Sequence, residues 1–134
     1  MRILTAAIAL LALFAVACAT TPGTATATPG SASVSLAAAK DGDSVRLTLT
    51  NGSGQPVAYN LCTSALYQRA SADWRIVNTD HACTMELRTL GPGANDTFAY
   101  PLPAAVARGQ YQLRSSVEIA GTRREVASNS IALP

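Results

Sequence analysis

The sequence predicts an all-β sandwich of seven to nine short antiparallel strands within residues 34–134. Apolar residues in this part recur with a period of two, as in strands that bury one face. Turn residues separate these runs at intervals of about 8–12 residues, which is the spacing expected for a sandwich. The chain of 134 residues fits one domain and excludes two full-sized ones.

The clearest strand is predicted over residues 44–51. Val45, Leu47 and Leu49 share one face, and polar side chains alternate with them on the other face. The following residues 51–56, with the sequence NGSGQP, form a turn cluster that ends the strand.

The other strands are predicted from the same alternation. We expect them around Val57, Tyr59 and Leu61; Leu66 to Arg69; Trp74 to Val77; Met85, Leu87 and Leu90; Phe98, Tyr100 and Leu102; Tyr111, Leu113, Val117 and Ile119; and Val126 to Leu133. Residues 70–73 should connect a hairpin, and residues 103–107 should form one helical turn. Trp74 and Phe98 are the bulkiest candidates for the core.

Residues 1–17 are predicted to be a secretory signal peptide. Arg2 supplies a positive charge, and the apolar run that follows is shorter than the ~20 residues needed to span a membrane. Ala15-Val16-Ala17-Cys18 resembles the lipobox of bacterial lipoproteins, with Ala15 where Leu is usual. This resemblance implies that Cys18 is lipidated; plain secretion that leaves Cys18 as a free thiol is the alternative.

The residue after the cysteine indicates the destination of the protein. Ala19 follows Cys18, where an Asp is absent, and this is similar to the outer-membrane sorting pattern of lipoproteins. We therefore expect a lipid-anchored protein of the bacterial cell envelope, in the outer membrane and facing the periplasm. Residues 18–33 are rich in Thr, Ala, Pro and Gly and lack long apolar side chains, which predicts a flexible tether.

The cysteine count predicts a disulfide. If Cys18 carries lipid, Cys62 and Cys83 remain, and two thiols in an oxidising compartment should pair. A metal site would need more ligands than the single histidine, His81, provides, and a catalytic thiol would need a partnering base.

Several segments of the predicted domain resemble bacterial Ig-like domains. They are the run VRLTLTN before Gln55-Pro56-Val57, the run Trp74-Arg75-Ile76-Val77, the turn Leu90-Gly91-Pro92-Gly93-Ala94, and the run Gly109-Gln110-Tyr111-Gln112-Leu113-Arg114. The same order is similar to the domain named for the Bacillus intracellular proteinase inhibitor. The resemblance covers about residues 44–119 and implies an Ig-like sandwich, without transferring any reactive site.

The composition favours a protein without catalytic, cofactor or nucleic-acid function. Charged residues make up 13% of the chain and the net charge is +2, so the basic stripe of a nucleic-acid binder is missing. The acidic residues fall mainly in or beside turns, and Asp80 with His81 is better read as a solvated turn than as an acid–base pair. We therefore expect no catalytic residue, no cofactor and no metal ligand.

We expect a monomeric envelope lipoprotein that contacts an unidentified envelope protein or has a structural role. The alternative is a periplasmic inhibitor of a protease or other hydrolase that acts through a loop at the end of the sandwich. A further alternative is a metal-handling protein that uses His81, Met85 and the thiols. For the partner contact we name Asn78, Asp80 and His81, because the disulfide constrains their loop, and the stretch 101–109 comes second.

Overall fold

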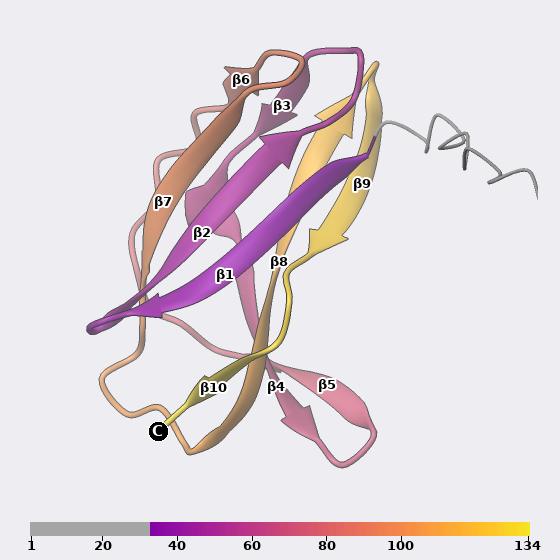
Figure 1. The fold of residues 1–134 in the computed structure, drawn as a ribbon. Coiled ribbons are helices and arrows are strands. Elements are labelled where there is room, and N and C mark those ends of the chain that lie inside the picture. Colours follow the sequence, from indigo (N-terminus) through magenta and orange to yellow (C-terminus); the bar gives the residue numbers. More distant parts are fainter. Residues whose placement is uncertain (1–32) are drawn as a thin grey trace, which may run out of the picture.

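A computed structural model describes residues 33–134, which form a β-sandwich of two antiparallel sheets (Figure 1). The fold class predicted from the alternation is confirmed, with ten strands in the described part where seven to nine were expected. The signal peptide, the tether and Cys18 lie outside the described residues. Within residues 33–134, no helix has the length and apolarity needed to cross a membrane.

The strands follow one another along the chain with a single 3-10 turn between them. In order they are β1 (Val34–Asp41), β2 (Ser44–Asn51), β3 (Val57–Tyr59), the turn η1 (Leu61–Thr63), β4 (Ala65–Ala70), β5 (Asp73–Val77), β6 (Arg88–Leu90), β7 (Asn95–Pro101), β8 (Gly109–Ile119), β9 (Thr122–Ala127) and β10 (Ile131–Leu133).

The smaller sheet has the strand order β1-β2-β7. The alternation predicted for β2 is correct, because Val45, Leu47 and Leu49 are fully buried. In this sheet Leu47 pairs with Phe98 and Val45 pairs with Tyr100 of β7. Branched and aromatic side chains at these positions pack against the facing sheet and hold the sandwich together.

The larger sheet is organised around β8, the longest strand. Along one edge of β8, its N-terminal part pairs with β10 and its C-terminal part pairs with β9. Along the other edge, the N-terminal part pairs with β4 and the C-terminal part pairs with β3. β5 extends the sheet beyond β4, and β6 extends it beyond β3. Figure 1 shows the consequence: the β4–β5 hairpin projects at one end of the sandwich, and β3 and β6 lie at the other.

The core lies between the two sheets and contains aliphatic and tyrosine side chains. Tyr100 and Tyr111 are its largest fully buried members. Phe98 packs against this core from a partly buried position, as expected. The expectation for Trp74 is wrong, because Trp74 lies half-buried on the projecting hairpin, where the Arg69 guanidinium is 5.9 Å from its ring. In β5, Trp74 has the same parity as Ile76, and this parity faces away from the core on the outer side of the larger sheet.

Four local expectations are also wrong. The strand expected over Val126 to Leu133 is interrupted, because β9 ends at Ala127 and β10 begins at Ile131. The strand expected to reach Leu61 ends at Tyr59, because the Asn60 side chain accepts a hydrogen bond from the Cys62 amide and starts η1. Met85 and Leu87 are not in a strand, since β6 begins at Arg88. Residues 103–107 form a loop and no helical turn.

Asn51 joins the end of β2 to the connections around it and is fully buried. Its Nδ2 donates to the carbonyl oxygens of Gln55 (2.8 Å) and Leu90 (3.0 Å). Its Oδ1 accepts from the amide (2.9 Å) and the hydroxyl (2.6 Å) of Ser53. One side chain therefore ties the turn after β2 to the end of β6, in the other sheet.

Candidate partner surface and the disulfide-bonded loop

The segment between β5 and β6, residues 78–87, is held to η1 by a disulfide between Cys62 and Cys83. Asn60 adds a second link, because its Nδ2 donates to the Thr84 carbonyl at 2.6 Å. The predicted pairing of the two cysteines thus appears in the structure. The bridge closes a loop of sequence separation 21 and fixes the otherwise irregular segment to η1.

His81 faces the interior and not the solvent. One ring nitrogen, Nε2, lies 2.9 Å from the Cys62 carbonyl oxygen, and because a carbonyl only accepts, this nitrogen donates. The ring meets the edge of the Tyr100 ring at a centroid distance of 4.8 Å. Next to it, the hydroxyl groups of Thr79 and Tyr100 are 2.9 Å apart. His81 therefore helps to hold the loop against β7.

The predicted contact residues fall into two environments. Asn78 and Asp80 are exposed and accessible to a partner, whereas His81 is half-buried with its ring turned toward Tyr100. The structure does not bring the three side chains together as one exposed patch. Contact of Asn78 and Asp80 with a partner stays a prediction.

The side chains of Cys62, His81 and Cys83 also form the kind of cluster that binds metals. Their ligand atoms lie within 4.8 Å of one another. The two sulfur atoms are bonded to each other, however, and a metal needs the thiolate form of cysteine. Met85, which the metal-handling alternative also requires, is on the outer face of the larger sheet, where it lines a groove with Ala58 and Leu87.

The exposed large apolar side chains of residues 33–134 lie on this outer face of the larger sheet, with Met85 and Leu87 toward one end and Ile76 toward the other. Met85 and Leu87 are 86% and 63% exposed and form one wall of a groove of about 230 Å³. Ser116 and Glu118, which alternate with the buried residues of β8, contribute to the same groove. We call this feature the outer-face groove.

Ile76 continues the apolar character along the same face. It is 67% exposed and pairs with Tyr67 of β4, which in turn pairs with Gln112 on the outer side of β8. The Arg114 guanidinium lies 4.3 Å from the Tyr67 ring centroid. Exposed apolar and aromatic groups beside arginine are the composition that protein-binding surfaces favour.

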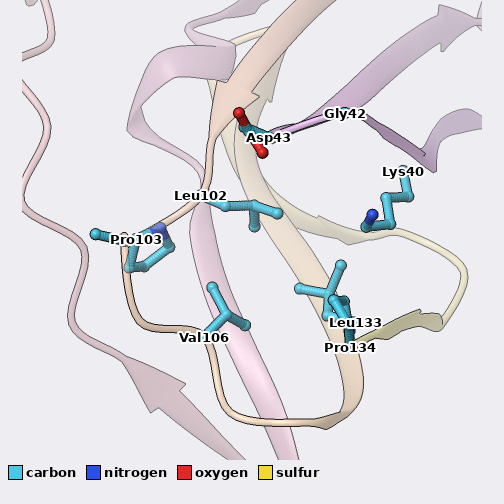
Figure 2. A pocket seen from close by; sticks show the side chains of 9 residues that line it. Lys40, Gly42, Asp43, Leu102, Pro103, Val106, Leu133 and Pro134 are labelled. Atoms are coloured by element: carbon cyan, nitrogen blue, oxygen red, sulfur yellow. The ribbon is translucent and has the colours of Figure 1, made fainter.

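A second hollow lies at the end of the sandwich, where the β1–β2 turn meets the loop between β7 and β8 (Figure 2). Leu102, Val106 and Leu133 provide its apolar wall, while Lys40 and Asp43 carry opposite charges at its rim. Its volume is about 440 Å³. The second predicted contact stretch, residues 101–109, thus forms one side of this pocket.

Buried tyrosines account for the perturbed titratable groups of the core. Burial, with a hydrogen bond to the Asp96 carboxylate, raises the pKa of Tyr59 from 10.0 to about 12. Asp96 is also paired with Arg88 at 2.7 Å. Burial likewise raises the pKa of Tyr100 and of Tyr111. These phenols stay protonated near neutral pH; Tyr59 donates to Asp96, Tyr111 donates to the Ala107 carbonyl, and Tyr100 is hydrogen-bonded to Thr79.

The outer-face groove was missed in the sequence because alternation does not distinguish the two faces of a sheet. Met85 and Leu87 share a parity, which predicts a strand with one buried face. In the structure residues 84–87 precede β6 and all of them are exposed, so neither parity of this segment faces inward.

A scan against models of protein families finds no match to this chain, and a search of curated proteins finds no significant similarity.

Proposed function

We propose that the chain is a non-catalytic lipoprotein of the bacterial envelope, and that its Ig-like domain binds another protein through the outer face of its larger sheet. The lipobox-like sequence ending at Cys18 supports the anchor and the outer-membrane location. In this proposal residues 18–33 are the tether between lipid and domain.

Two features support the Ig-like assignment. The orders β1-β2-β7 and β9-β8-β3 correspond to strands A-B-E and G-F-C of the immunoglobulin arrangement. In addition, the Tyr111 hydroxyl near the start of β8 donates to the Ala107 carbonyl at 2.6 Å. A tyrosine that bonds back to the preceding backbone in this way is typical of Ig-like sandwiches.

The observation that carries the binding proposal is the position of the exposed apolar residues. Met85 and Leu87 adjoin in the outer-face groove, and Ile76 lies on the same face toward the β4–β5 end. Single exposed apolar residues need no explanation, but adjoining ones beside a groove support an interaction surface. The disulfide holds the Met85–Leu87 segment in place, which lowers the entropy lost on binding.

The test is site-specific photo-crosslinking of the full chain in cells. A photoreactive residue is placed at position 85 or 87, and in matched controls at Ala37 or Arg46, which are exposed on the smaller sheet. The proposal expects an adduct of one defined mass from positions 85 and 87 and none from the controls. Adducts that form equally from both sheets, or from neither, would contradict it.

The inhibitor alternative is favoured by one observation, the firmly held loop at the end of the sandwich. Its base is fixed by the Tyr111–Ala107 bond and by the Leu102 amide, which donates to the Asp43 carbonyl at 3.3 Å. Between these points Ala104 and Ala105 are exposed. If crosslinks form from position 104 to a hydrolase and not from position 85, the inhibitor function replaces the first proposal.

A further inference from the structure

The projecting β4–β5 hairpin leaves β5 as a terminal strand of the larger sheet, with one side unpaired within the described part of the chain. β5 makes extensive contact only with β4. The other edges of the larger sheet are shorter or covered: β6 has three residues, and β9 carries three charged residues in a row and contacts β1. In the smaller sheet β7 is a longer terminal strand, but it contacts η1, and Thr79 and His81 of the bridged segment lie against its Tyr100. β5 is therefore the terminal strand most open to pairing with another strand.

The hairpin register identifies the backbone groups that face outward. Ala70 pairs with Asp73 across a two-residue connection, and such a closing pair is hydrogen-bonded. Because hydrogen-bonded pairs alternate along an antiparallel ladder, the amides and carbonyls of Trp74 and Ile76 point toward the open side. These are the groups that an added strand would meet.

The side chains of β5 favour a second copy of the same strand as the partner. We propose that two copies of the chain pair antiparallel through β5, with a two-fold axis at Trp74. In this register Trp74 faces Trp74 of the second copy, and Asp73 of each copy faces Arg75 of the other. Both charged residues are exposed, and neither has an ion-pair partner among the described residues.

Charge selects this register over the neighbouring one. A shift that pairs Trp74 with Ile76 would place the two Arg75 side chains opposite each other, where like charges are destabilising. With the axis at Trp74, the Asp73–Arg75 pairs occupy non-hydrogen-bonded positions, at which facing side chains are closest. Each copy offers one β5, so the pairing closes as a dimer and does not extend into a fibre.

The dimer would join two larger sheets into one, with both outer faces on the same side. It does not depend on the proposed function, because β5 uses its backbone edge while the outer-face groove stays open. It replaces the monomer expected from the sequence and gives the chain two equivalent surfaces for a partner.

The test is a charge exchange read out by co-capture of two differently tagged full-length chains produced in one cell. Wild-type chains should capture each other. Asp73→Arg alone and Arg75→Asp alone should each lower self-capture at least tenfold, because both place like charges opposite one another. Asp73→Arg should capture Arg75→Asp at the wild-type level, since the mixed pair restores opposite charges at every position.

Controls separate this result from misfolding and from surface charge in general. Arg108→Asp changes an exposed charge outside β5 and should leave self-capture unchanged. Unaltered urea midpoints of the single variants would show that they fold. The proposal is overturned if wild-type chains do not capture each other, if Asp73→Arg captures itself as well as wild type does, or if the mixed pair shows no rescue. Each of these outcomes is independent of the crosslinking result from position 85.

Discussion

Asn51 is the residue whose replacement tests most directly how the two sheets are tied together. Alanine at this position removes four side-chain hydrogen bonds. The Leu90 carbonyl and the Ser53 amide then lie buried without these partners, whereas Gln55 is exposed and water can replace its bond. Each buried group left unpaired costs about 1–3 kcal/mol. We therefore expect Asn51→Ala to lower the free energy of unfolding by about 2–6 kcal/mol, a large part of the ~5–15 kcal/mol typical of a domain.

Asn51→Asp refines the test because it keeps the shape and the acceptor oxygen and loses only the donor. The new carboxyl group faces two carbonyl oxygens in a buried site. Burial disfavours its charged form and raises its pKa above the unfolded value, so the folded state binds the proton more tightly. The variant should therefore be closest to wild type at about pH 4 and should lose stability as the pH rises to about 7.

Urea unfolding followed by circular dichroism measures both variants at the two pH values. Asn95→Asp is the matched control, because Asn95 is exposed on β7 and its replacement should change stability by no more than about 0.5 kcal/mol. A loss below about 1 kcal/mol for Asn51→Ala would refute the reasoning. So would an Asn51→Asp variant that is destabilised equally at both pH values.

Three further predictions concern the bridge, the anchor and a buried phenol. Replacing Cys62 and Cys83 together with Ala should lower the free energy of unfolding by about 3 kcal/mol, from the loop that the bridge closes, and an unchanged urea midpoint would contradict this. Cys18→Ser should move the protein from the membrane fraction to the soluble periplasm without changing the urea midpoint, and a wild-type protein that is already soluble would exclude the anchor. In an absorbance titration of the tyrosines, Tyr59→Phe should remove the ionisation that has a pKa of about 12. The raised pKa means that the stability supplied by protonated Tyr59 is complete below about pH 10 and is lost as the pH rises through about 12, so alkaline destabilisation should be weaker in the variant.

The sequence predicts the fold class well because burial on one face leaves a period of two in the central strands. β2 and β8 show this pattern, and the apolar positions buried as expected are Val45, Leu47, Leu49, Tyr111, Leu113 and Val117. Short elements are harder to predict. The strand expected through Leu61 ends early because of a side-chain cap at Asn60, and a single polar residue leaves little trace in an alternation.

The candidate site was predicted only in part because its geometry depends on contacts far apart in the chain. The pairing of Cys62 with Cys83 follows from counting cysteines, but the direction in which the bridged loop faces does not. His81 turns inward because Tyr100, nineteen residues later, offers an aromatic edge. Trp74 stays out of the core because it has the parity of Ile76 in β5, and the register places that parity on the outer face of the larger sheet.

The central position of β8 has a consequence for the order in which the protein folds. β3, β4, β9 and β10 all pair with this one strand, which begins at Gly109. Before β8 is available, the chain can form the local hairpins β1–β2 and β4–β5 but cannot assemble the larger sheet. Pairings over such long sequence separations slow folding. A chain that we propose to be exported would therefore complete its larger sheet only after nearly all of it had crossed the membrane.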